Sequence, residues 1–139
     1  MKYLLDTDWL LDVIGGVPGA ARRLEELRPL GLGVSIISHG ELFEGTFGFP
    51  DSEERLAEIR GFLDQFDTIP LTDPIMEIFG RTRSGLRRTG RLIPDLDLLI
   101  AATAVHHEFV LLTRNVRHFS RIPGLPLYPF VAPAVSPET

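Results

Sequence analysis

The chain has 139 residues, of which 44% are hydrophobic and 24% are charged, a balance typical of one folded globular domain. Its formal net charge of −5 argues against nucleic-acid binding through an overall positive field. The absence of cysteine excludes disulfides, thiolate metal sites and cysteine nucleophiles, so any metal ion must bind oxygen or imidazole ligands.

The N-terminal third of the chain predicts a strand, two helices and a second strand. Residues 3–5 form an apolar run that ends at Asp6, which indicates a short buried strand with a carboxylate at its end. Apolar residues at helical spacing then predict a short helix over 9–14 and another over 20–27, each ended by proline or glycine. The second strand is expected over residues 34–37.

The middle third predicts three helices and one weak strand. Ser38 and Glu41 have the S-x-x-E spacing of a capping box, so a helix is expected to begin directly after the second strand. A further helix has its core stripe within residues 56–66. A marginal strand over 69–71 follows, and residues 72–74 then supply a cap and a proline for the start of a long helix.

The C-terminal third begins with a helix that is apolar on all sides. The apolar run 98–105 is far shorter than the roughly 20 residues needed to cross a bilayer, and its alanines favour a helix buried against a sheet. Residues 109–113 predict a strand, 114–119 a turn with a short helix, and 127–128 a final edge strand.

These elements predict one domain over residues 1–130 and a flexible tail over 131–139. The tail contains Pro133 and Pro137. At the other end, Asp6 interrupts the apolar start before a signal core can develop. We therefore expect a cytoplasmic protein with no membrane association.

The alternation of strands and helices predicts the fold class. Parallel neighbours in a sheet need crossover connections, which place helices on both faces. We therefore predict an α/β fold, namely a three-layer α/β/α sandwich with a mostly parallel sheet of four or five strands. In such sheets ligands bind beyond the carboxyl ends of the strands.

Three acids occupy similar positions relative to the predicted strands. Asp6 follows the first strand, Glu41 follows the second by one helical turn, and Asp97 opens the helix before the last long strand. Asp8 and Asp95 stand two residues from the first and third of them. Crowded carboxylates repel one another unless cations are present, and Mg²⁺ or Mn²⁺ prefers oxygen ligands. Such a site suits attack of water on a phosphodiester, although each acid could instead cap a helix or favour its dipole.

Arginine supplies thirteen of the fourteen basic residues. Five of them fall within eleven residues of the long helix and the loop after it, and three more form a second group near the last strand: Arg81, Arg83, Arg87, Arg88 and Arg91, then Arg114, Arg117 and Arg121. Guanidinium forks suit phosphate oxygens. A solvated helix face is the equally simple interpretation.

Four segments together form the pattern of a known family. They are Lys2-Tyr3-Leu4-Leu5-Asp6-Thr7-Asp8, Ser35-Ile36-Ile37-Ser38-His39-Gly40-Glu41-Leu42, Ile93-Pro94-Asp95-Leu96-Asp97-Leu98-Leu99-Ile100-Ala101-Ala102 and Leu112-Thr113-Arg114-Asn115-Val116-Arg117-His118-Phe119. In this order and spacing they resemble the PIN-domain ribonucleases, specifically the VapC-like toxins of toxin–antitoxin pairs. The resemblance covers residues 1 to about 130. No single segment is specific to this family, but the four segments in this order and spacing are a strong signal for it.

The resemblance implies an Mg²⁺- or Mn²⁺-dependent endoribonuclease, often a homodimer, that a cognate antitoxin neutralises. Asp6, Glu41 and Asp97 match the family's catalytic acids, with Asp6 and Asp97 as metal ligands and Glu41 and Asp95 as further candidates. Thr7 and Asn115 would support them. Candidate contacts to RNA are Arg114 and Arg117, with Arg83 and Arg87 as additional candidates.

The chain departs from the family pattern at the fourth acid. Asn115 and His118 stand where the family often has an aspartate, which leaves the fourth ligand and the number of metal ions open. One alternative is therefore a catalytically weakened module that binds RNA or protein. The Asp6-Thr7-Asp8 segment is also a superficial match to haloacid dehalogenase-like phosphatases, but these need a lysine on a later strand and Lys2 is the only lysine.

Large apolar residues predict an interaction surface. Two parts of the chain carry more apolar surface than a domain of this size easily buries. They are the long helix with Ile75, Phe79 and Leu86 and the segment with Phe43, Phe47 and Phe49. We expect a homodimer, and a groove near Phe47 for the antitoxin. The alternative is that Phe43 and Phe47, four residues apart, belong to the ordinary core.

Overall fold

The computed structural model describes residues 3–128 and contains four strands, seven α-helices and one 3₁₀ turn there. In chain order the elements are β1 (Tyr3–Leu5), α1 (Thr7–Ile14), α2 (Ala20–Leu27), η1 (Arg28–Leu30), β2 (Leu32–Ser35), α3 (Ile36–Thr46), α4 (Ser52–Leu63), β3 (Asp67–Ile69), α5 (Asp73–Arg88), α6 (Asp95–His107), β4 (Val110–Leu112) and α7 (Val116–Phe119). The expected flexible tail, residues 131–139, lies outside the described residues.

The sheet has the strand order β3-β2-β1-β4, and every neighbouring pair is parallel. This confirms the predicted three-layer α/β/α fold with a parallel sheet. β1 is central, and the chain leaves it first toward β2 and later returns to its other side as β4. The space beyond the carboxyl ends of β1 and β4 is therefore the topological switch point, where open α/β sheets bind their ligands.

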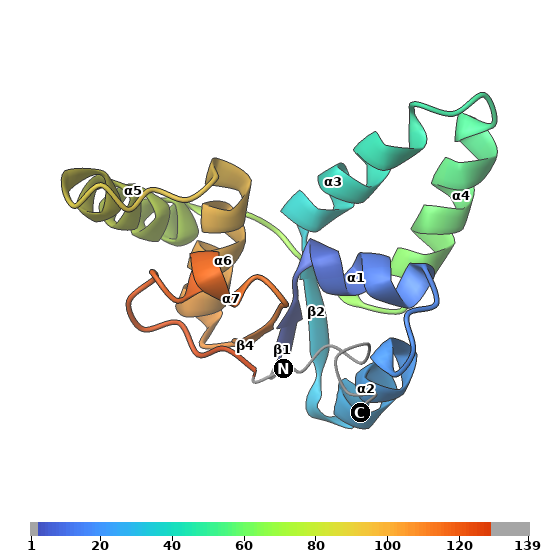
Figure 1. Cartoon of the computed structure of the whole chain (residues 1–139), viewed down its shortest axis with the longest axis horizontal. Helices are drawn as coiled ribbons and strands as arrows, with labels where there is room; N and C mark the ends of the chain where they lie inside the picture. Colours follow the sequence, from blue (N-terminus) through green and yellow to red (C-terminus); the bar gives the residue numbers. More distant parts are fainter. Residues whose placement is uncertain (1–2, 129–139) are drawn as a thin grey trace.

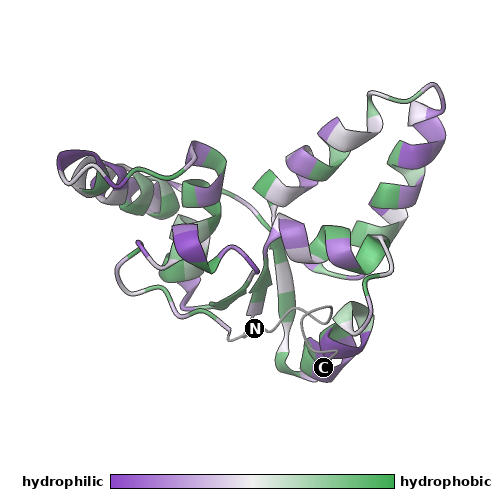
Figure 2. Cartoon of the chain, viewed as in Figure 1, coloured by the Kyte–Doolittle hydropathy of each residue, from purple (hydrophilic) through white to green (hydrophobic). Residues whose placement is uncertain are grey.

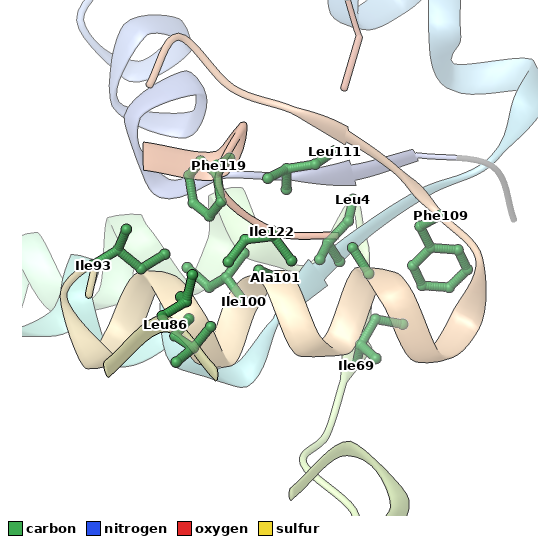
Figure 3. Packing of buried hydrophobic residues seen from close by; sticks show 12 residues of the cluster. Leu4, Ile69, Leu86, Ile93, Ile100, Ala101, Phe109, Leu111, Phe119 and Ile122 are labelled. Carbon is green, nitrogen blue, oxygen red and sulfur yellow. The ribbon is translucent and has the colours of Figure 1, made fainter. Parts of the chain in front are cut away.

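Alternating side chains along the strands divide the core into two halves. Leu4 and Leu111 face a cluster formed with α5, α6 and α7, whereas Leu5 and Leu112 face a second cluster formed with α1 to α4. In Figure 1 the two groups of helices lie on opposite sides of the sheet. Figure 3 shows Ala101 of α6 packed near Leu4 and Leu111.

Small side chains and uniform apolarity explain the position of α6. Leu98, Ile100, Ala101 and Ala104 are fully buried, and the helix lies against the sheet as predicted. Figure 2 shows mostly hydrophobic strands, whereas α4 and α5 alternate between hydrophobic and hydrophilic residues because one face of each meets solvent. No helix within residues 3–128 is both long and apolar enough to traverse a membrane.

Four details of the predicted elements were wrong. β2 ends at Ser35, whose side chain caps α3 by accepting from the Ile37 N–H at 3.0 Å. Ser38 is therefore a buried residue inside α3, and the predicted capping box with Glu41 does not form. The weak strand after α4 covers Asp67–Ile69 rather than 69–71. The expected edge strand is a single bridge from Leu127 to Leu111.

Candidate active site at the carboxyl edge of the sheet

Asp6 occupies the centre of the switch point. It directly follows β1, caps α1 and is only 5% exposed. Its Oδ1 accepts from the Thr7 N–H at 2.8 Å, and its Oδ2 accepts from the Thr113 hydroxyl at 2.6 Å. Burial raises the pKa of Asp6 from 3.8 to about 7, and the charges of Asp8 and Asp97 add to the rise. The ionised carboxylate is thus destabilised until a positive charge compensates it.

Asp8 is the second acid at this edge. Its Oδ2 accepts from the Arg114 backbone N–H at 3.1 Å, and it lies 3.4 Å from the Thr113 hydroxyl. Its Oδ1 is buried without a hydrogen-bond partner among residues 3–128. Burial raises the pKa of Asp8 as well. Buried polar atoms in folded proteins nearly always have a partner, so this carboxylate oxygen beside Asp6 is a position where a cation or a hydrogen-bond donor would bind.

Glu41 projects from the second turn of α3 toward α1. The Thr7 hydroxyl donates to Glu41 Oε1 at 2.5 Å and lies 2.8 Å from the hydroxyl of Ser38. Thr7 directly follows Asp6, so its hydroxyl links the end of β1 to Glu41 on α3, the helix that follows β2. Because Ser35 rather than Ser38 caps the helix, Glu41 is free of a capping role and its carboxylate turns to the sheet edge.

Asp97 enters the same edge from the first turn of α6. His118 Nδ1 lies 3.2 Å from Asp97 Oδ2 and 2.9 Å from the side-chain nitrogen of Asn115. Asn115 is fixed in turn, since its backbone N–H donates to the Thr113 hydroxyl at 2.9 Å. The structure therefore joins Asn115, His118 and Asp97 in one group.

Asp95 does not join the other acids. It is exposed and bound by Arg83 of α5 at 2.8 Å. Arg83 is thereby placed next to the start of α6, while Arg87 and Arg117 are exposed.

Arg114 forms a clamp across the sheet edge. Its Nε and Nη2 donate to the two carboxylate oxygens of Asp12, at 2.6 and 3.0 Å. Asp12 is largely buried on α1, so this bidentate pair ties α1 to the turn after β4. The pair gives Arg114 a structural role in addition to the RNA contact expected of it.

Sequence reasoning missed Thr113, Ser38 and Asp12. One signal was available for Thr113, because it follows β4 directly, just as Asp6 follows β1. No local pattern pairs Asp12 with Arg114, which are 102 residues apart.

The side chains present fit a hard divalent cation. The groups at the edge are carboxylate oxygens and one imidazole, Oδ1 of Asp8 has no hydrogen-bond partner among residues 3–128, and the charges of Asp8 and Asp97 add to the rise in the pKa of Asp6. Within residues 3–128, however, no three His, Asp or Glu side chains already stand in the arrangement of a metal centre. Asp6, Asp97, Glu41 and Asp8 are the residues that could hold the ion.

The parallel α/β fold and the acidic side chains at the carboxyl ends of its strands together indicate the class of this protein. The PIN domain model matches residues 3–125, and the chain belongs to the PIN domain family. Among curated relatives it is 37% identical to Ribonuclease VapC19 of Mycobacterium tuberculosis, across 88% of this chain and 95% of that protein. It is 29% identical to the tRNA(fMet)-specific endonuclease VapC of Shigella flexneri, across 90% of this chain and 95% of that protein.

Solved structures give the same result. The VapBC2 structure from Rickettsia felis, bound to a DNA fragment from its promoter, matches with a TM-score of 0.87 and 28% identity, across 94% of this chain and 100% of that one. The family assignment removes the support for a haloacid dehalogenase-like phosphatase.

Proposed function

We propose that this chain is a divalent-metal-dependent endoribonuclease and the toxin of a VapBC-type toxin–antitoxin pair, acting in the cytoplasm. The observation that carries the proposal is the buried carboxylate of Asp6, which lies at the carboxyl end of β1 and shares the Thr113 hydroxyl with the neighbouring carboxylate of Asp8. Burial and the neighbouring acids raise the pKa of Asp6 accordingly. Such a cluster is unfavourable in an empty site and favourable around Mg²⁺ or Mn²⁺.

The residues around the cluster have distinct tasks in this mechanism. A bound Mg²⁺ or Mn²⁺ would supply Lewis-acid activation of water and neutralise charge on the phosphate. Thr113 and the Thr7 N–H hold both oxygens of Asp6 in place. The Thr7 hydroxyl orients Glu41.

Asp97 and the arginines complete the proposed site. Asp97 brings its negative charge from the opposite side of the sheet, on the first turn of α6. Arg117, exposed on α7, would bind a flanking phosphate by its guanidinium fork. Arg83 and Arg87 on α5 would extend that contact along the RNA.

The test is cleavage of RNA by the purified chain with and without a divalent cation. Because one relative is named for tRNA(fMet), total tRNA is a suitable first substrate. We expect cleavage with Mg²⁺ or Mn²⁺ and none in excess EDTA. Asp97→Asn should lose at least about a hundredfold in rate, because the charge is removed while the shape is kept.

Asp73→Asn is the matched control, since Asp73 is an exposed acid in the first turn of a different helix. It should cleave like the unmodified chain. Circular dichroism must show that Asp97→Asn is folded. Full cleavage in excess EDTA would contradict the proposal.

The second candidate is a non-catalytic module that binds RNA or protein. It is favoured by Asn115 and His118, neither of which is an acid, and by the lack of a preformed three-residue metal centre in the described part of the chain. RNA binding without cleavage under every cation tested would support this candidate instead.

We also propose a homodimer and an apolar site for the antitoxin. Phe47 and Phe49, in the turn after α3, are 58% and 47% exposed, and a groove of about 200 Å³ lies between α1, α3 and α4. Leu11 and Ile14 line this groove and are also exposed. Apolar surface of this kind is characteristic of binding sites.

A further inference from the structure

A pocket of about 510 Å³ lies between the C-terminal half of α5 and the loop that follows α7. Its surface is mostly apolar and includes Leu86 and Pro123, and three arginines also line it: Arg81, Arg91 and Arg121. In the described part of the chain, no acidic side chain lines this pocket. An apolar pocket of this size with a few polar groups is typical of a ligand-binding site.

Hydrogen bonds to the backbone fix two of these arginines in place. α5 ends in a turn in which Gly90 adopts a φ of 69°, and the Arg91 N–H donates to the carbonyl of Leu86 at 2.8 Å, as in the common glycine-containing helix end. From the other wall, Nη1 of Arg121 donates to the carbonyls of Arg91 and Leu92, at 3.3 and 3.0 Å. The two walls of the pocket are therefore tied together.

The positive charge of the pocket is only partly compensated. Arg81 forms an ion pair with Glu77 at 2.7 Å. Arg91 and Arg121 have no ion pair with any acid in the described part of the chain, and the carbonyls bound by Arg121 are uncharged. In a chain with a net charge of −5, this pocket is a local exception that favours an anionic occupant.

Both walls of the pocket connect directly to the acidic edge of the sheet. Arg121 stands three residues after His118, whose ring contacts Asp97 at 3.2 Å. Arg91 stands four residues before Asp95, a stretch that spans at most about 14 Å. Figure 1 shows α5, α6 and α7 on the same side of the sheet. An RNA strand with one phosphate at Asp97 can therefore extend to this pocket.

Gly85 keeps the pocket open. Arg81 and Thr89, one turn before and one turn after Gly85, also line the pocket, so Gly85 lies at the centre of the helix face that forms this wall. A Cβ atom at this position would meet only Nη2 of Arg88, at 3.8 Å, which is an ordinary contact. Packing within the chain does not require a glycine here, although glycine is unfavourable inside a helix.

We infer that this pocket binds one unpaired nucleotide of the substrate RNA, next to the phosphate that is cleaved. The base would lie on the apolar wall, and Arg91 and Arg121 would bind its phosphate. The inference rests on the proposed function. Unpaired bases stack on apolar surfaces and on guanidinium planes, so a base and its phosphate match both parts of the pocket. An acidic protein segment would match the arginines and leave the apolar wall uncovered.

The test compares RNA with and without bases. Fluorescence anisotropy in excess EDTA would measure the affinity for a short oligouridylate and for an abasic ribose–phosphate chain of the same length. We expect the unmodified chain to prefer the oligouridylate by at least about fivefold. Gly85→Leu fills the pocket and should bind both probes alike. Equal binding of the two probes by the unmodified chain overturns the inference, as does a preference that survives in Gly85→Leu.

Gly80→Leu is the matched control. Gly80 is an exposed glycine of the same helix, no atom lies within 4 Å of its Cβ position, and it does not line the pocket. This variant should keep the preference for bases. Both substitutions replace a helical glycine by a better helix former, so both variants should fold, and circular dichroism checks this.

Arg91→Gln separates the phosphate contact from the base contact. It should weaken the binding of both probes by the same factor and lower the slope of log affinity against log salt by about 0.7, while the preference for bases remains. An unchanged slope contradicts the phosphate contact. An oligoglutamate peptide that binds the unmodified chain and not Gly85→Leu would overturn the inference and assign the pocket to an acidic protein segment. Cleavage of RNA without a preference for bases overturns this inference alone, whereas the absence of both binding and cleavage overturns the proposed function as well.

Discussion

Replacing Asp6 by asparagine should stabilise the metal-free protein, and the gain should depend on pH. The carboxyl group is 5% exposed, and its pKa rises from 3.8 to about 7 in the folded chain. Because one pKa unit corresponds to about 1.4 kcal/mol, ionising Asp6 costs on the order of 4 kcal/mol more in the folded than in the unfolded state. Asparagine keeps the shape without the charge.

The direction of the pH effect follows from proton binding. Between pH 3.8 and about 7 the folded chain holds a proton on Asp6 that the unfolded chain has lost. The stabilisation of the unmodified protein by this proton is full below pH 3.8 and is lost as pH rises through 7. The difference in unfolding free energy between Asp6→Asn and the unmodified chain should therefore rise by about 2 to 4 kcal/mol over this window and stay constant above it.

Urea unfolding in EDTA at several pH values measures this difference. The only tryptophan, Trp9, is completely buried, so its fluorescence reports global unfolding. A loss of the Thr113 hydrogen bond in Asp6→Asn shifts all values equally and leaves the pH dependence intact. Adding Mn²⁺ should stabilise the unmodified chain and not the variant. A difference that is independent of pH, or that falls as pH rises, would refute the reasoning.

Three further outcomes are expected. Arg83→Gln combined with Arg87→Gln should lower the slope of log RNA affinity against log salt by about 0.7 per lost phosphate contact; an unchanged slope would mean that both are only solvated residues. A double-mutant cycle of Asp12→Asn and Arg114→Gln, followed by urea unfolding, should give a coupling of about 1 kcal/mol, since the guanidinium is partly exposed, whereas additivity would contradict the clamp. Light scattering at tens of micromolar should report a dimer, and a monomer alone would remove the homodimer proposal.

The periodicity of the chain was sufficient to predict most of the fold. The uniformly apolar run in α6 was correctly interpreted as a helix buried against a parallel sheet. The error at the start of α3 has a local cause: Ile36 and Ile37 are β-branched and favour strands, and both Ser35 and Ser38 are acceptable caps. Only the sheet pairing, which ends at Ser35, decides between them.

The candidate site was only partly predictable. The ends of the first two strands predicted Asp6 and Glu41 at one edge, and the hypothesis of a metal site added Asp97, but most of the hydrogen-bond partners of these acids come from distant parts of the chain. Thr113 is 107 residues from Asp6, and no local spacing encodes such a contact. The contact of His118 with Asp97 likewise depends on how α7 packs against α6. Tertiary packing, not local pattern, sets these orientations.

The division of the core into two halves has a mechanical consequence. The strands that separate the two clusters have only three or four residues each. Each group of helices therefore packs on its own side of a small sheet. The acids come from both sides, with Glu41 on α3 and Asp97 on α6. A cation bound by both acids would link the two groups of helices across the sheet. Its binding should slow amide hydrogen exchange in α3 and α6 together, while the outer helices α2 and α4 continue to exchange as before.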